Sequence, residues 1–185
     1  DDGEVLIKGA NIFQGYFKNE DASREALADG WLHTGDIGRV DEDGFLYITG
    51  RKKDIIITAG GKNITPANLE NWLKENRWIS QAVVVGDRRP YLVALITLDP
   101  DEAPAFAKEH GLRVEELPES EAMRAEIQRA VDRVNERLAR VEQIKRFALL
   151  PHDLSQETGE LTPTLKVKRN VVVEKHAGAI ESLYA

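Results

Sequence analysis

A change in the spacing of glycines and apolar residues near residue 50 is the feature that most limits how this chain can fold. Before it, short apolar stretches are interrupted by seven glycines within about forty residues: Gly9, Gly15, Gly30, Gly35, Gly38, Gly44 and Gly50. Such frequent glycines predict turns between short strands, and thus a β-meander or partial barrel rather than a helical unit. After it, the charged link Arg51–Asp54 leads into longer apolar patterns. The chain is therefore expected to divide at this link.

The first fifty residues are predicted to contain few regular elements. Glu4–Lys8 is typical of a brief strand, and only Asp21–Ala28 has a helical pattern. Asp41–Gly44 predicts a hairpin turn between strands at 37–40 and 45–48, with Gly44 free to adopt positive φ.

The residues after the link alternate between strand and helix patterns. Strands are expected at 55–58, 81–85, 91–98 and 144–150, helices from Pro66, at 100–110, at 119–141 and from 167 onward, and a polar loop at 151–163. This order predicts a small α+β domain of about 130 residues. The helix at 119–141 carries apolar residues spaced alternately by four and three, which suits a coiled coil or, as the favoured interpretation, a helix packed on a sheet.

Composition narrows the function. The chain has 185 residues, and 25 basic against 32 acidic side chains give a net charge of −7, which argues against nucleic acid as a partner. The absence of cysteine excludes disulfides and thiol chemistry, and the four histidines are too scattered to predict a metal site. No segment is typical of a transmembrane helix or signal peptide, so a cytoplasmic protein is expected, with peripheral membrane contact left open. The start at Asp1-Asp2-Gly3, without Met, suggests a piece of a longer protein.

Three stretches carry candidate chemistry, each with a plainer alternative. Trp31–Gly38 places Asp36 between two glycines, where a chain reversal would present its carboxylate to a ribose diol or where it would merely cap a turn. Arg51–Asp54 with the following Gly60-Gly61 suits either a hinge beside a bound anion or a solvated linker. Leu161–Arg169 lies at the end of a long polar loop and carries several cations. One of these basic residues could reach into a neighbouring site, or the cations could simply mark the start of a helix.

Together, in this order, the stretches resemble the C-terminal third of the adenylate-forming superfamily of acyl-CoA synthetases, peptide-synthetase adenylation domains and luciferases. The matching segments are Gly3–Phe17, Trp31–Gly38, Gly50–Asp54, Gly60–Glu70 and Leu161–Arg169. The resemblance implies a β-rich end piece of the large N-terminal domain at 1–50, a hinge at 51–53 and a mobile C-terminal α+β domain at 54–185. The Thr-Pro-Thr-Leu-Lys form, with Leu165 where the family more usually has glycine, and the insertion between Leu98 and Arg140 are most similar to the long-chain fatty-acid–CoA ligases.

The resemblance implies a two-step reaction. A fatty carboxylate attacks the α-phosphate of MgATP to give an acyl-adenylate and pyrophosphate, and the thiol of CoA then displaces AMP. ATP, Mg²⁺ and CoA would be bound mainly with the rest of the N-terminal domain, whose phosphate loop is missing here, so this piece alone is expected to be inactive. The implied roles are catalytic for Lys166, nucleotide binding for Asp36 and Arg51, a hinge for Lys53, and the CoA channel for Gly60 and Gly61.

Two other functions remain open from the sequence. An adenylation domain would pass its acyl group to a carrier protein instead of CoA, and a non-catalytic domain would merely bind nucleotide. The long insertion and the Thr-Pro-Thr-Leu-Lys form favour CoA as the acceptor.

Overall fold

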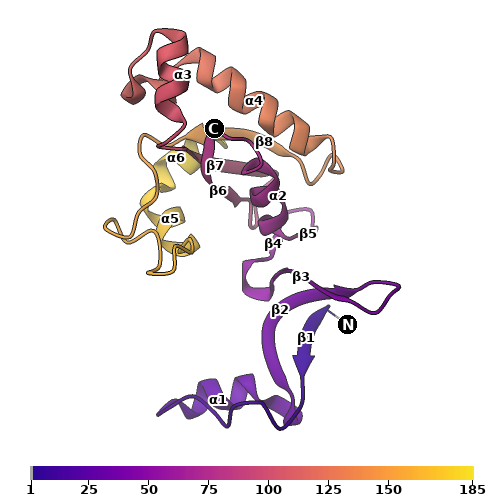
Figure 1. Cartoon of the computed structure of the whole chain (residues 1–185). Helices are drawn as coiled ribbons and strands as arrows, with labels where there is room; N and C mark the ends of the chain where they lie inside the picture. Colours follow the sequence, from indigo (N-terminus) through magenta and orange to yellow (C-terminus); the bar gives the residue numbers. More distant parts are fainter. Residues whose placement is uncertain (1) are drawn as a thin grey trace. The chain divides into compact units, whose positions relative to one another are not determined.

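The computed structural model describes residues 2–185 and divides into two compact units, one ending at Ile55 and the other spanning Ile56–Ala185 (Figure 1). The division falls close to the predicted link. The hinge role of residues 51–53, and the boundaries drawn on either side of it, stay predictions.

The first unit is built on an antiparallel three-stranded sheet in the order β1-β2-β3. Its elements are β1 (Glu4–Ile7), α1 (Glu20–Ala26), β2 (Leu32–Val40) and β3 (Leu46–Arg51), with short 3-10 helices at Ala28–Gly30 and Lys52–Asp54. The predicted turn between β2 and β3 is confirmed: Asp41 Oδ1 accepts the backbone N–H of Phe45 at 2.8 Å, and Gly44 has φ +87°. The strand before this turn is longer than expected: β2 begins at Leu32, whereas the sequence predicted a strand at 37–40.

Within residues 2–55 no side chain is buried. The β2–β3 hairpin exposes the large apolar side chains Val40, Phe45, Leu46, Tyr47 and Ile48. A sheet stabilises itself by burying one apolar face against another layer. In the described part of this unit α1 contacts β2, but the apolar side chains of the hairpin stay exposed.

The second unit has a three-stranded sheet in the order β6-β7-β8. The strands are β6 (Ile79–Val85), β7 (Leu92–Leu98) and β8 (Ile144–Leu149), and the central β7 pairs antiparallel with β6 but parallel with β8. Residues Leu92–Ile96 of β7 are all at most 1% exposed. Burial on both faces explains why this strand is a continuous apolar run instead of an alternating one.

Helices cover both faces of this sheet (Figure 1). Side chains of α2 (Pro66–Leu73), α3 (Ala103–His110) and α4 (Glu121–Asn135) pack with the face that carries Val84, Ala94 and Ile96. Side chains of α5 (Arg169–Lys175) and α6 (Ala177–Ser182) pack with Val83, Val93 and Leu95 on the other. The predicted α+β fold class is confirmed. Among the described residues, no helix is long and apolar enough to cross a membrane.

The helix predicted at 119–141 is shorter than its apolar spacing indicates. It begins after Ser120, whose hydroxyl accepts the backbone N–H of Met123, and ends at Asn135. The Asn135 side chain donates to the carbonyl of Ile144 and accepts its N–H, both at 2.9 Å, which ties the helix end to the start of β8. Val141 lies beyond the helix and is 62% exposed, whereas Ile127 is buried against the sheet. Packing on the sheet is therefore the correct interpretation of the pattern.

Smaller differences concern other boundaries. The strand predicted at 55–58 is only the two-residue β4 (Ile56–Ile57), paired antiparallel with β5 (Asn63–Ile64). The helix expected at 100–110 begins at Ala103. The closing helix begins only at Arg169 and is interrupted at His176, which ends α5 and precedes α6.

Candidate functional site

Asp36 lies within a strand and not at a chain reversal, which corrects the sequence-based expectation. It is in β2 directly opposite Arg51 of β3. Arg51 Nη1 donates to Asp36 Oδ1 at 2.6 Å, and this hydrogen bond raises the pKa of Arg51 above its ordinary value. One carboxylate oxygen is thus occupied, while the other has no donor among residues 2–185. The two predicted nucleotide-binding residues form one cross-strand pair.

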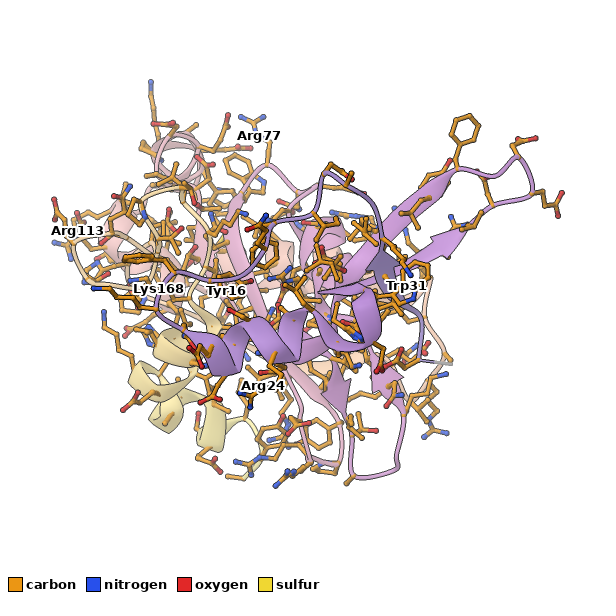
Figure 2. All side chains as sticks on the ribbon, turned by 90° about the horizontal axis from the view of Figure 1, so that it is seen from below. Tyr16, Arg24, Trp31, Arg77, Arg113 and Lys168 are labelled. Carbon is orange, nitrogen blue, oxygen red and sulfur yellow. The ribbon has the colours of Figure 1, made fainter. Side chains whose placement is uncertain are left out.

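A cavity of about 340 Å³ lies beside this pair in the first unit. Its lining includes Tyr16, His33, Gly35, Arg51 and Lys53. Tyr16 and Trp31 lie before and after α1, and both are labelled in Figure 2. The predicted hinge residue Lys53 and the predicted nucleotide ligand Arg51 therefore line the same cavity, which brings two cations to one place suited to an anion.

Sequence reasoning missed an ionic cluster centred on Lys52. Its Nζ lies 2.6 Å from Asp2 Oδ2 and 2.9 Å from Glu4 Oε2. The hydrogen bond to Asp2, and then that to Glu4, raise the pKa of Lys52 to about 12, and Lys52 in turn lowers the pKa of Asp2 to about 2. Glu4 Oε1 also accepts the N–H of Gly35 at 3.0 Å. The cluster fastens the charged link to β1, and no local motif could reveal it because the partners are 48 residues apart.

Gly60 and Gly61 form an open turn between β4 and β5. The turn is closed by hydrogen bonds from Gly61 N to the carbonyl of Thr58 at 2.8 Å and from Thr58 N to the carbonyl of Lys62 at 3.1 Å. Gly61 has φ +76°, and a Cβ placed on it would meet nothing within 4 Å. The backbone here is exposed to an approaching ligand, as the sequence suggested, while its place in a CoA channel stays a prediction.

Lys166 lies at the start of the return strand of a tight hairpin, which we call the lysine hairpin (residues 161–167). Leu161 pairs with Val167, Thr162 N donates to the carbonyl of Lys166 at 2.8 Å, and Leu165 N donates to the carbonyl of Thr162 at 2.9 Å. Pro163 occupies the second position of the resulting β-turn, where its fixed φ is favourable. The Lys166 side chain is exposed and pairs with no carboxylate in the described residues. The predicted polar loop thus presents a free ammonium group on a short hairpin.

A partly buried ion pair anchors the chain just after the lysine hairpin. Arg169 Nη2 donates to Glu70 Oε1 at 2.6 Å, with only 24% and 12% of the two side chains exposed. Arg169 Nη1 also donates to the carbonyl of Val84, and Glu70 Oε1 accepts the Val84 N–H, both at 2.8 Å. The pair therefore satisfies the outward N–H and carbonyl of Val84 in the edge strand β6. It joins α5 to α2 across that edge.

A second anchor lies on the other side of the lysine hairpin. Glu160 is 3% exposed and its carboxylate contacts His176 Nε2 at 2.9 Å, Lys175 Nζ at 3.2 Å and the Thr158 hydroxyl. Burial raises the pKa of Glu160, but these hydrogen bonds and the charge of Lys175 outweigh it, so the pKa lies below its ordinary value. The Glu160 carbonyl also accepts the N–H of Lys168 at 2.8 Å. The residues on both sides of the lysine hairpin are thus held by contacts with the rest of the second unit.

The described residues contain no group of three or more His, Asp or Glu side chains arranged to hold a metal ion.

Residues 53–185 match the family described as the AMP-binding enzyme C-terminal domain. The chain belongs to this family. The resemblance to adenylate-forming enzymes found in the sequence is thereby confirmed, and the lysine hairpin and the Gly60–Gly61 turn both lie inside the matched domain.

Curated relatives extend the match across the whole chain. The long-chain-fatty-acid–CoA ligase FadD15 of Mycobacterium tuberculosis is 52% identical over 100% of this chain and 31% of its own length. The human long-chain-fatty-acid–CoA ligase ACSBG1 is 43% identical over 98% of the chain and 28% of its own length. The chain therefore spans about 30% of the length of the relatives that it matches.

Solved structures agree with the AMP-binding C-terminal domain assignment. The A-PCP didomain of carboxylic acid reductase from Segniliparus rugosus, in complex with AMP, has a TM-score of 0.77 at 26% identity and covers 99% of this chain and 25% of that chain. The o-succinylbenzoate CoA synthetase MenE from Bacillus subtilis, also with AMP, has a TM-score of 0.64 at 29% identity and covers 90% of this chain and 29% of that chain.

Proposed function

We propose that this chain is the C-terminal part of a long-chain fatty-acid–CoA ligase that uses ATP to form an acyl-adenylate and then transfers the acyl group to CoA. The observation that carries the proposal is the 52% identity to FadD15, named a long-chain-fatty-acid–CoA ligase, over the whole chain. The exposed apolar hairpin β2–β3 and the lack of any buried side chain in residues 2–55 fit a first unit that packs against further parts of a larger domain.

Lys166 is proposed as the catalytic cation of the first step. When a carboxylate attacks the α-phosphate of ATP, two anions approach and negative charge grows on the phosphoryl oxygens, so a preorganised cation lowers the barrier. The Lys166 ammonium is free of carboxylate partners among the described residues, and both ends of its hairpin are anchored. A compact ammonium on a flexible stem is suited to this contact.

Asp36 and Arg51 are proposed to bind the nucleotide. The unoccupied oxygen of Asp36 is available to accept a hydrogen bond from a ribose hydroxyl, and Arg51 pairs with the other oxygen while it offers further N–H donors. The adjacent cavity, with Lys53 in its lining, supplies positive charge for an anion. Lys53 is proposed as the hinge, and Gly60 and Gly61 as part of the channel for the pantetheine of CoA.

Mg²⁺ is proposed to enter with ATP. Since residues 2–185 offer no metal ligand cluster, we assign no residue of this chain to it. Its ligands would include the phosphates of ATP.

The test uses the full-length enzyme and fatty acids of graded chain length. ATP–pyrophosphate exchange measures the first step, and thioester formation after addition of CoA measures the second. Lys166→Ala should lower exchange by about 10²–10³-fold, the usual effect of removing one group that stabilises transition-state charge. Lys168→Ala is the matched control, because Lys168 is an exposed neighbour that contributes its backbone N–H, and it should stay within about twofold of wild type.

Each outcome has a distinct meaning. Exchange with long acids that collapses only in Lys166→Ala supports the proposal. Undiminished exchange in that variant would place the catalytic cation elsewhere. Acyl product on a phosphopantetheinyl carrier protein, with none on free CoA, would identify the protein as an adenylation domain. The absence of exchange with every acid tested would favour a non-catalytic nucleotide-binding domain.

A further inference from the structure

Leu165, next to the proposed catalytic cation, has an unfavourable backbone conformation. Its φ is +59°, in the left-handed region, and it is the one large apolar residue among the described non-glycine residues with positive φ. It is the last residue of the three-residue hairpin loop 163–165, a position where glycine is favoured for steric reasons. A side chain in this conformation shifts the folding equilibrium unfavourably by about 5–30-fold.

The Leu165 side chain is also poorly packed in the described structure. It is 64% exposed, the highest value among the large apolar residues of the second unit. A strained residue that persists without local packing indicates that its side chain is used elsewhere. Its Cα lies about 3.8 Å from that of Lys166, so docking of the lysine brings this leucine close to the same surface.

We propose that Leu165 is an apolar anchor that seats the lysine hairpin on the surface surrounding the bound fatty acid and ATP. This inference rests on the proposed function. The surface would come from the rest of the same enzyme, since FadD15 has more than two thirds of its length outside the match. Leu165 acts through Lys166 and is a positioning residue. Burying its exposed part would favour the seated state by about 5–30-fold.

Three variants of the full-length enzyme separate the side chain from the backbone strain. Leu165→Gly removes both, Leu165→Ala keeps the strain but removes most of the side chain, and Leu165→Met keeps an apolar side chain. Val141→Ala is the matched control, because Val141 is also apolar and is 62% exposed in a turn of the same unit. The readouts are ATP–pyrophosphate exchange, thioester formation from supplied acyl-adenylate and CoA, and the urea midpoint.

The expected result is a variant that is more stable but less active. Leu165→Gly should have a urea midpoint above that of Leu165→Ala, while both lower kcat/KM for exchange by about 5–30-fold for fatty acid and ATP alike. Thioester formation from supplied acyl-adenylate should stay within twofold of wild type, as should all activities of Leu165→Met and Val141→Ala.

Two results would overturn the anchor while leaving the proposed function intact. Exchange within twofold of wild type in both Leu165→Gly and Leu165→Ala would mean that the side chain has no role in seating Lys166. A rise in KM for the fatty acid alone would mean that Leu165 contacts the substrate and not the enzyme surface. Wild-type enzyme without exchange for any acid would overturn the proposed function and this inference together.

Discussion

The Glu70–Arg169 pair predicts a large stability loss from a single substitution. Arg169→Met removes the donor to the Val84 carbonyl and leaves the Glu70 carboxylate without its counter-charge. A buried peptide group without a partner costs about 1–3 kcal/mol, and breaking a buried ion pair costs about 3–5 kcal/mol. These costs overlap, and water reaches the partly exposed Arg169 site. We therefore expect a loss of about 2–4 kcal/mol in the free energy of unfolding.

A double-mutant cycle identifies the source of this loss. Glu70→Gln keeps an oxygen that can accept the Val84 N–H but removes the charge, so it should cost about 1–2 kcal/mol. In the double variant Arg169→Met no longer leaves an unpaired carboxylate. The double variant should therefore lose at least about 1 kcal/mol less than the sum of the single variants, as expected for coupled neighbours.

The assay is urea unfolding of the 185-residue chain at pH 7, followed by circular dichroism and by tryptophan fluorescence. Arg113→Met is the control, because the Arg113–Glu116 pair is exposed, with 75% of the arginine side chain accessible, and should contribute less than about 1 kcal/mol. A loss below about 0.5 kcal/mol for Arg169→Met, or strict additivity in the cycle, would refute the argument that this pair completes the edge of β6.

Two further predictions concern the anchor at Glu160 and the hinge. The pKa of Glu160 lies below its unfolded value of about 4.5, so its stabilisation is present above pH 4.5 and is lost as the pH falls through the folded pKa. Glu160→Gln should therefore cost about 1–3 kcal/mol at pH 7, and urea unfolding between pH 7 and 3 should show this difference narrowing; a constant difference would contradict the linkage. Lys53→Pro in the full-length enzyme should slow thioester formation by about 10–100-fold, because a fixed φ hinders the rotation, while pyrophosphate exchange survives. If both steps fell together, the hinge assignment would be wrong.

Elements with local signals were predictable from the sequence. The turn at Asp41–Gly44 needs an aspartate that accepts backbone N–H groups and a glycine at positive φ, and both residues stand within one four-residue segment of the sequence. The buried strand β7 was recognisable as an apolar run between turns. The family motifs located Lys166 and Gly60–Gly61, although the shape of their loops did not follow from the motifs.

The contacts that fix the site are long-range and were not predictable. Asp36 was expected at a chain reversal because two glycines flank it, but pairing with Arg51, 15 residues away, keeps it in a strand. The end of α4 at Asn135 is set by hydrogen bonds to Ile144, which override an apolar spacing that continues to Val141. The lysine hairpin could not be predicted from the sequence, because Leu165 occupies the position where a hairpin loop of this length favours glycine.

The hydrogen bonds that Glu70 and Arg169 make with Val84, on the edge strand β6, have a consequence for the chain during synthesis. Val84 donates its N–H to Glu70, which is synthesised earlier, and its carbonyl accepts a hydrogen bond from Arg169, which is synthesised 85 residues later. Until Arg169 emerges, the Val84 carbonyl on this edge is without its partner, and an exposed strand edge is a template for pairing with another chain. Nascent or truncated chains that stop before Arg169 are therefore the species in which β6 is open to intermolecular sheet extension and aggregation.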